Sequence, residues 1–171
     1  CARTGGKSLA MASLTGNEAN IHAVDVDARV FDELGKRAKR AGVSIQTHWV
    51  AQDDPRPMQE FEGCADRVLV DAPCSSLGTL ARKPWLKWQY GKDQIDSFAQ
   101  TQELVLHKQS KWVKPGGLLG YCVCSILPEE NSNVVAAFLS NNPEFTSQAE
   151  HFVIPPEFEG DGFYFHLLAR R

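Results

Sequence analysis

The sequence predicts a doubly wound α/β fold, in which a mainly parallel sheet carries helices on both faces. Apolar runs typical of buried strands alternate along the chain with segments whose apolar residues recur at helical spacing. Such alternation requires crossover connections, which leave consecutive strands parallel. At 171 residues with 43% hydrophobic composition, the chain is long enough to bury one core, so we expect a single domain over residues 1–171.

The first part of the chain supplies two strands and the helix between them. IHAVDV (21–26) has the uninterrupted apolar character of a buried strand, and apolar residues then recur from Val30 to Ala41 at helical spacing. Gly42 is a typical helix stop. VSIQTHWV (43–50) follows as the second strand, and a polar loop follows it.

The second part repeats the pattern with longer elements. RVLV (67–70) is a short strand that ends abruptly at Asp71. A long helix runs from about Ile95 to Trp112 and stops before Pro115, because proline cannot continue a helix. The remaining predicted elements are the strand LLGYCV (118–123), a helix whose first turn is Pro128–Glu130, and a final strand FYFHLLA (163–169).

Polar residues stand at or just after the ends of the predicted strands. They are Asp25, Asp53, Asp71 and Cys124. In open α/β sheets, ligands bind outside the carboxyl ends of the strands. We therefore expect these four side chains along one edge of one sheet, where a ligand would bind.

The opening residues CARTGGKS (1–8) resemble a strand-to-helix turn whose preceding strand is absent. Glycines let the backbone approach a ligand, and a helix N-terminus offers N–H groups to an anionic part of it. Asp25 follows at about the twenty-residue distance at which nucleotide-binding α/β domains hold ribose hydroxyls. A structural turn explains the glycines equally well, and Asp25 or Asp27 could cap the helix that follows.

The cysteines do not form a recognisable framework. The five residues make an odd set without CxxC spacing, which argues against structural disulfides or zinc, so we expect reduced thiols and no metal. Cys74 and Cys124 lie in polar, turn-like junctions, which is unusual for a residue that is most often buried. Cys122 lies inside a strand and is expected in the core. A redox or metal-binding role for Cys122 and Cys124 would need further ligands nearby.

One short segment has the composition of a nucleic-acid contact. RKPWLKWQYGK (82–92) interleaves four cationic residues with Trp85, Trp88 and Tyr90 and contains no acid. Cations for phosphates and flat rings for bases suit single-stranded nucleic acid. The alternative is a solvated loop whose tryptophans pack on the core. Because the formal net charge is −3, any attraction to nucleic acid has to be local.

Two further features of the sequence bear on where in the cell the protein is found. No apolar run approaches the ~20 residues that span a bilayer, and no basic-then-apolar leader opens the chain. We therefore expect a cytoplasmic monomer that does not contact membranes.

Four motifs together resemble the RsmB/Sun (Fmu) family of RNA cytosine-5 methyltransferases. They are CARTGGK, AVDVDARV, DAPCSSLG and YCVCSILPEEN, and the closing GDGFYFHLLAR fits as well. The resemblance implies S-adenosylmethionine as cofactor on a Rossmann-like sheet and 5-methylcytosine in RNA, with ribosomal RNA as the expected substrate. It assigns Asp25 to the ribose, Asp53 to the adenine and Asp71 to the methionine end. It also places at the cofactor the opening residues Cys1, Ala2, Arg3, Thr4, Gly5, Gly6 and Lys7.

The same resemblance assigns the catalytic roles. Cys124 would attack carbon 6 of the cytosine, Cys74 would help to release the product, and Asp71 would act at the N3 edge of the ring. A cysteine thiolate suits the attack because it is strongly nucleophilic. The target base has to leave its stack, and the resemblance raises the expectation that it is flanked by Arg82, Lys83, Lys87 and Trp88.

Two departures from the family pattern accompany the resemblance. Arg3 and Thr4 stand where the family usually has a small residue and a proline. An alternative function is therefore a catalytically impaired RNA- or cofactor-binding domain of the same fold. Family members also carry an N-terminal RNA-binding region and a first sheet strand, so we expect a catalytic-domain fragment.

Overall fold

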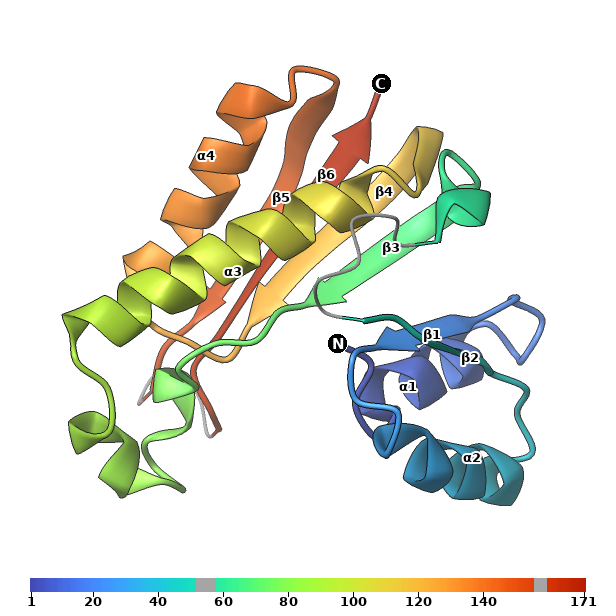
Figure 1. Cartoon of the computed structure of the whole chain (residues 1–171), viewed down its shortest axis with the longest axis horizontal. Coiled ribbons are helices and arrows are strands. Elements are labelled where there is room, and N and C mark those ends of the chain that lie inside the picture. The colour runs from blue at the N-terminus through green and yellow to red at the C-terminus, as the bar shows by residue number, and fades with distance from the viewer. Residues whose placement is uncertain (52–57, 156–159) are drawn as a thin grey trace. The chain divides into compact units, whose positions relative to one another are not determined.

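The computed structural model describes residues 1–51, 58–155 and 160–171 (Figure 1). Asp53, expected near the adenine, lies outside the described residues. The chain divides into two compact units, Cys1–Met58 and Gln59–Arg171, and each has its own sheet. Among the described residues, no helix combines the length and the apolar character needed to cross a membrane.

The first unit is a small two-layer α/β structure. It contains α1 (Gly6–Leu14), β1 (His22–Asp25), α2 (Val30–Ala41) and β2 (Gln46–Trp49). The two strands pair in parallel, with Asp25 opposite Trp49, as the sequence predicts for strands joined by a helix. Ala23 on β1 packs against Leu34 and Ala38 of α2 to form the core of this unit.

A glycine begins the first helix for two physical reasons. Gly5 has φ 82°, a left-handed conformation that costs other residues energy. A Cβ atom at Gly5 would also lie 2.8 Å from Cγ of Leu34, closer than packed carbons approach. The turn from residue 1 to α1 therefore depends on glycine at this position.

The second unit is built on a four-stranded sheet in the order β3-β4-β6-β5. Its strands are β3 (Ala65–Asp71), β4 (Val113–Val123), β5 (Phe145–Val153) and β6 (Phe163–Arg170). The helices α3 (Lys92–Ser110) and α4 (Ser132–Asn141) lie on the same face of this sheet (Figure 1). Short 3₁₀ helices occur in the loops: η1 (Gln59–Phe61), η2 (Leu77–Thr79), η3 (Pro84–Trp88) and η4 (Pro128–Glu130).

The prediction of a mainly parallel sheet was wrong for this unit, because its sheet is mixed. β3 and β4 are parallel, but β6 runs antiparallel to both β4 and β5. The sequence analysis did not identify β5. Only residues 154–162 separate it from β6, and this connection is too short for the crossover of a dozen or more residues that parallel strands require. The two strands therefore pair as an antiparallel hairpin.

β4 is central to the core of the second unit. Leu119, Tyr121 and Val123 alternate along β4, and each is fully buried. The ring of Tyr121 packs edge-on against Tyr164 of β6, with centroids 6.3 Å apart. α3 adds the fully buried Leu106. This core and the parallel pairing place β3 and β4 side by side, and the loops described next follow their carboxyl ends.

Candidate active site

The structure brings together the two cysteines that the sequence analysis singled out. β3 ends at Asp71 and its parallel neighbour β4 ends at Val123, so the loops that follow leave the sheet side by side. Cys74 lies in the first loop and Cys124 in the second, and their Sγ atoms are 3.4 Å apart. Both residues are partly exposed free thiols. The pair is therefore accessible and in direct contact.

The contact gives the two thiols different acidities. A hydrogen bond from Cys74 lowers the pKa of Cys124 to about 6, and Ser76, whose Oγ lies 3.4 Å away, also lowers it. Burial and the charge of Asp71 oppose this shift without cancelling it. The pKa of Cys74 is raised well above its ordinary value, because its proton is held by Cys124 and because it is buried. One thiol is thus poised as a thiolate near neutrality while the other holds its proton.

Ser76 adopts an unusual backbone conformation for a residue with a side chain. Its φ is 60° and its ψ 21°, in the left-handed region. Strain of this kind costs roughly 1–3 kcal/mol and concentrates at functional sites. In this loop the strained conformation accompanies the placement of Ser76 Oγ against Cys124.

The loop after β3 packs against the loop after β4 with almost no spare room. Gly78 N donates a hydrogen bond to the Cys124 carbonyl at 2.9 Å, and Gly78 O accepts one from Gly162 N at 2.7 Å. A Cβ atom on Gly78 would lie 2.1 Å from the Gly162 carbonyl oxygen. Gly78 is required here because of the close backbone approach, and it connects the Cys124 loop with the start of β6.

Asp71 and Cys122 form a second contact between the ends of β3 and β4. Cys122 is 1% exposed, which confirms the expectation that it belongs to the core. Its Sγ lies 3.6 Å from Oδ1 of Asp71, the residue opposite it in the parallel register. No group of three or more His, Cys, Asp or Glu side chains in the described part of the chain is arranged to hold a metal ion.

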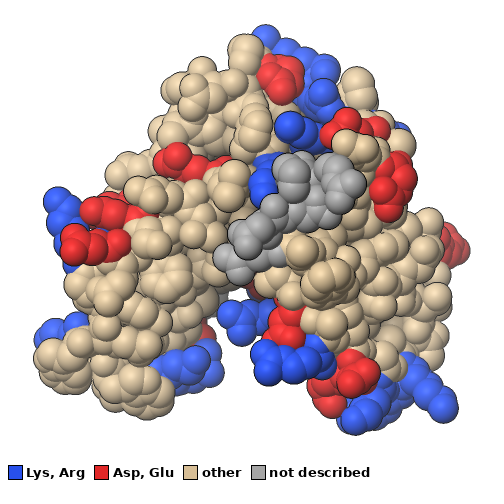
Figure 2. All heavy atoms as spheres, in the orientation of Figure 1, with Lys and Arg blue, Asp and Glu red and all other residues tan. Residues whose placement is uncertain are grey.

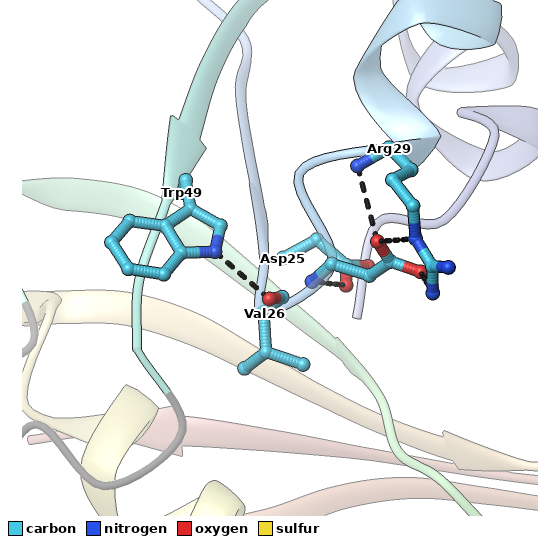
Figure 3. Close-up of polar contacts among 5 residues, drawn as sticks. Asp25, Val26, Arg29 and Trp49 are labelled. Carbon is cyan, nitrogen blue, oxygen red and sulfur yellow. Dashed lines mark hydrogen bonds and ion pairs between the residues drawn. The ribbon is translucent and has the colours of Figure 1, made fainter.

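Asp25, the acid expected to bind ribose, is at the carboxyl end of β1 in the first unit (Figure 3). It is 6% exposed, and it accepts hydrogen bonds from the backbone N–H groups of Arg3 at 2.8 Å and Asp27 at 3.0 Å. Burial acts to raise the pKa of Asp25, but the hydrogen bonds from these two N–H groups act to lower it, and the pKa is lowered overall. Asp25 is therefore ionised, and its side chain is held in place by hydrogen bonds from the backbone of Arg3 and Asp27.

The opening turn is held from two sides. Arg3 has φ 47°, and its N–H points at Asp25. The guanidinium of Arg37 on α2 donates to both the carbonyl and the hydroxyl of Thr4, at 2.8 and 3.1 Å. Ala2 N donates to the Val24 carbonyl of β1 at 3.0 Å. The residues that depart from the family pattern are thus built into the hydrogen bonding of the turn.

Two apolar side chains beside Asp25 were missed by the sequence analysis. Val26 is 49% exposed and Trp49 is 59% exposed, and the indole N–H of Trp49 donates to the Val26 carbonyl at 2.9 Å (Figure 3). The parallel register that places Trp49 opposite Asp25 could have indicated this proximity. A flat apolar surface next to an ionised acid suits a nucleoside, because the acid can bind hydroxyls while the base lies on the ring.

The tryptophans of residues 82–92 do not pack in the core, contrary to the alternative interpretation. Leu86 is the buried residue of η3, whereas Trp85 is 58% and Trp88 78% exposed. Lys87 Nζ lies 5.7 Å from the Trp88 ring centre, within cation–π range. Figure 2 shows Lys and Arg side chains bordering uncharged surface at the lower left, where Figure 1 draws the segment before α3.

The predicted RNA-contacting residues differ in their surroundings. Arg82 forms a two-pronged ion pair with Asp161, with Nε 2.9 Å from Oδ1, so it links the η3 region to the segment before β6. Lys83, Lys87 and Trp88 are exposed. We refer to Lys83, Trp85, Lys87 and Trp88 as the η3 patch.

Together, the fold and the cysteine site indicate the class of protein to which the chain belongs. The chain has an α/β methyltransferase-like fold, in which antiparallel strands β6 and β5 extend the parallel pair β3–β4, and two solved structures match this fold well. PH0851 matches with a TM-score of 0.88 and 33% identity over 96% of this chain and 40% of that one. NSun6 from Pyrococcus horikoshii, solved with SFG, matches with a TM-score of 0.87 and 24% identity over 99% of this chain and 46% of that one.

The family follows from the sequence comparison. Residues 1–169 match the family described as 16S rRNA methyltransferase RsmB/F, and the chain belongs to that family. Ribosomal RNA small subunit methyltransferase B of Proteus mirabilis is 36% identical over all of this chain and 40% of its own length. The protein of the same name from Klebsiella pneumoniae (strain 342) is 37% identical over all of this chain and 41% of its own. The chain thus spans about two fifths of the length of these relatives.

Proposed function

We propose that residues 1–171 form the catalytic domain of an S-adenosylmethionine-dependent methyltransferase that makes 5-methylcytosine in ribosomal RNA through a covalent bond to Cys124. The observation that carries the proposal is the 3.4 Å contact between the thiols of Cys74 and Cys124 at neighbouring strand ends. Membership of the RsmB/F family supports the reaction class and the substrate. Because the two thiols differ in pKa, they suit two different steps of one reaction.

Cys124 acts first in this mechanism. Carbon 5 of cytosine is a poor nucleophile, and addition of a thiolate to carbon 6 moves electron density from the ring double bond onto carbon 5. A pKa of about 6 leaves Cys124 mostly ionised at neutral pH, as the attack requires. We assign to Asp71 a hydrogen bond with N3 of the ring, in which its carboxylic acid form donates to the nitrogen as negative charge develops there.

S-adenosylmethionine, when bound, supplies the methyl group as a sulfonium electrophile. After the transfer, carbon 5 carries both a methyl group and a proton. Cys74 accepts this proton, the electron pair of the C–H bond restores the ring double bond, and Cys124 leaves carbon 6 as a thiolate. Once Cys124 is bonded to carbon, it no longer accepts the Cys74 proton as a thiolate, which removes the largest cause of the raised pKa of Cys74. Cys74 then loses its proton to solvent water, and the resulting thiolate takes the proton from carbon 5.

The residues of the first unit fit the cofactor. Asp25 is ionised and held in place, Val26 and Trp49 expose apolar surface beside it, and Gly5 permits the turn at the start of α1. We propose that Asp25 binds the ribose hydroxyls, that Val26 and Trp49 contact the adenine together with Asp53, and that residues 1–7 and Asp71 contact the methionine part.

We further propose that RNA contacts the η3 patch and Arg82. Exposed indole rings provide stacking surfaces for unpaired bases, and the lysines provide charge for phosphates. Arg82 already pairs with Asp161, so we assign it a supporting role in which it holds the segment while Lys83, Lys87 and Trp88 contact the RNA.

Substitution of the cysteines tests the mechanism. Cys124→Ala should abolish methylation and form no covalent RNA adduct, because nothing attacks carbon 6. Cys74→Ala should permit attack and methyl transfer but stall release, so a methylated protein–RNA species should accumulate on a denaturing gel. Cys64→Ala, which removes an exposed thiol outside the site, is the matched control and should behave as the wild type.

Other outcomes of this experiment are equally informative. An adduct with Cys124→Ala that is absent with Cys74→Ala would reverse the two assignments. No adduct with either variant of an active protein would contradict the covalent mechanism. If the wild type binds cofactor and RNA but transfers no methyl group, the chain is instead the catalytically impaired binding domain that Arg3 and Thr4 suggested.

A further inference from the structure

Glu130 is fully buried in the second unit, and the proposed reaction does not use it. It ends the short helix η4 with 0% exposure. Its carboxyl oxygens accept four hydrogen bonds from described residues, two at each oxygen. A buried carboxyl group requires hydrogen-bond partners of this kind. The positions of these donors, however, indicate a role beyond satisfying the carboxyl group.

The donors are the residues next to the two cysteines. Ser75 directly follows Cys74 and Ser125 directly follows Cys124, and both hydroxyls donate to the same atom, Oε2 of Glu130. The two serine oxygens are 3.4 Å apart, the same separation as the two cysteine sulfurs. One carboxyl oxygen thus joins two Cys-Ser dipeptides that are fifty residues apart in the sequence.

The other carboxyl oxygen of Glu130, Oε1, helps to hold the backbone on both sides of Cys74. Oε1 of Glu130 accepts from the backbone N–H of Ser75 at 2.8 Å and from Nε2 of Gln102 at 3.2 Å. Gln102, fully buried on α3, also donates to the carbonyl of Pro73 at 2.9 Å. Pro73 and Ser75 are the two neighbours of Cys74, so its backbone is held from both directions.

Glu130 is itself anchored to the sheet. The hydroxyl of Tyr121 on β4 donates to the Glu130 backbone carbonyl at 2.6 Å. Glu130 therefore bonds to β4 through its backbone carbonyl, while its carboxyl group bonds to both cysteine loops. A displacement of either loop would break at least one hydrogen bond to a fully buried carboxyl group.

We propose that Glu130 is a positioning residue that holds the thiols of Cys74 and Cys124 in contact. Its importance for methylation rests on the proposed function, whereas its effect on the thiol pair does not. If Glu130 only stabilises the fold, its replacement should lower stability and leave the properties of the thiols in the folded protein unchanged. Measurements on the thiols therefore separate the two roles.

Glu130→Gln is the discriminating variant. It keeps the size of the side chain, but a single amide oxygen cannot accept the bonds now made at both carboxyl oxygens. Tyr121→Phe is the matched control, because it removes a buried hydrogen bond to the same residue while leaving the carboxyl group and its four donors in place.

Two measurements on the purified full chain need neither RNA nor cofactor. The first is the rate at which diamide oxidises the pair, in which two thiols lose two electrons and two protons to the azo bond of diamide and form one disulfide, followed by peptide mass spectrometry. The second is the pH profile of Cys124 alkylation by iodoacetamide. With Glu130→Gln we expect oxidation to slow on the order of tenfold. We also expect the alkylation half-point to rise by about one pH unit, because the hydrogen bond from Cys74 is weakened.

The proposal is overturned if folded Glu130→Gln protein matches the wild type in both measurements, or if Tyr121→Phe changes them as much. Should Glu130→Gln not fold, Ser125→Ala decides instead, because it keeps Glu130 and removes one donor. A smaller change in the same direction supports the proposal, and wild-type behaviour contradicts it. If the thiol measurements change as expected but the cysteine adduct experiment fails, Glu130 positions the thiols and the proposed reaction is at fault.

Discussion

Cys124 shows how a few neighbours decide the chemistry of one side chain. The hydrogen bond from Cys74 and the hydroxyl of Ser76 lower its pKa, while burial and Asp71 act in the opposite direction. The hydrogen bond from Cys74 is the largest of these effects, so the thiolate is stabilised mainly by a second thiol, and the charge of Arg82 also interacts with it. The acidity of Cys124 is therefore a property of the pair rather than of the residue alone.

Removal of Cys74 should make Cys124 a weaker acid. In the wild type, we expect alkylation of Cys124 by iodoacetamide to be half-maximal near pH 6, because the thiolate reacts and the thiol does not. In Cys74→Ala the half-point should move upward, toward the value of about 8.5 for an unperturbed cysteine. At neutral pH the reaction should then slow on the order of tenfold. An unchanged half-point would show that the Cys74 thiol does not stabilise the thiolate.

Asp25 offers a second test at the scale of one residue. Asp25→Ala should weaken binding of S-adenosylmethionine by about 1–3 kcal/mol, because the ribose hydroxyls would lose their acceptor. Isothermal titration calorimetry measures the change, and Asp66→Ala, which alters an exposed acid of the second unit, is the control. A folded Asp25→Ala protein with wild-type affinity would contradict the placement of the ribose.

In the loops and short helices, the close packing of backbone atoms determines the geometry, rather than the chemistry of side chains. η2 fits between the Cys124 carbonyl and Gly162 because Gly78 has no Cβ atom. The contacts are with backbone atoms, which cannot move aside as the end of a flexible side chain can. The geometry of the cysteine pair therefore also depends on the segment that leads into β6.

Gly78→Ala should destabilise the protein. The added methyl group would meet the Gly162 carbonyl, and overpacking of this kind costs about 1–3 kcal/mol. Gly160→Ala, two residues from the same contact, meets nothing within 4 Å and should change stability little. Urea unfolding followed by circular dichroism compares the two variants, and equal midpoints would show that the Gly78 contact is not tight in solution.

The η3 patch should contribute to RNA affinity through stacking. Trp88→Ala should weaken binding of a single-stranded RNA by about 1–3 kcal/mol, the usual contribution of one aromatic platform. Leu14→Ala removes an exposed apolar side chain from the first unit and serves as the control. Fluorescence anisotropy with a labelled oligonucleotide measures both, and equal affinities would place the RNA contact elsewhere.

The strands and helices show what the sequence could predict. Continuous apolar runs identified β1, β3, β4 and β6, because buried strands need such runs whatever they pair with. β5 was missed, since exposed residues of FTSQAEHFV interrupt its apolar pattern, and the antiparallel pairing of β6 was missed with it. The connection between β5 and β6 was too short for a crossover, so the direction could have been predicted once the strand was recognised.

Some residues of the candidate site could likewise be predicted from the sequence, and others could not. Cys74 and Cys124 could be proposed from motifs, because their surroundings in the sequence are unusual for cysteine. Glu130 could be placed only in a helix first turn, since its partners Ser75 and Gln102 lie 55 and 28 positions away. Periodicity reports which face of an element is buried, but it contains no information on which distant hydrogen bonds that face makes.

The whole molecule consists of two units that differ in the size of their cores. The first has a two-stranded sheet and a core of Ala23, Leu34 and Ala38 with a few partly buried neighbours. The second has four strands, with fully buried residues along β4 and on α3. Stability within a protein follows buried apolar contacts, and a two-stranded sheet is marginal without further packing.

Native-state hydrogen exchange should therefore resolve two levels of protection. Amides of β1 and β2 should open with a lower free energy than those of β4 and β6, because fewer buried side chains separate when the first unit opens. S-adenosylmethionine at about 100 times its Kd should raise the opening free energy of the first unit by about 2.7 kcal/mol if the cofactor binds only when that unit is closed. Asp25→Ala should reduce this increase at the same cofactor concentration. Uniform protection across both sheets would contradict the difference in stability, and a cofactor effect confined to β4 and β6 would contradict the assignment of the cofactor to Asp25 and the opening turn.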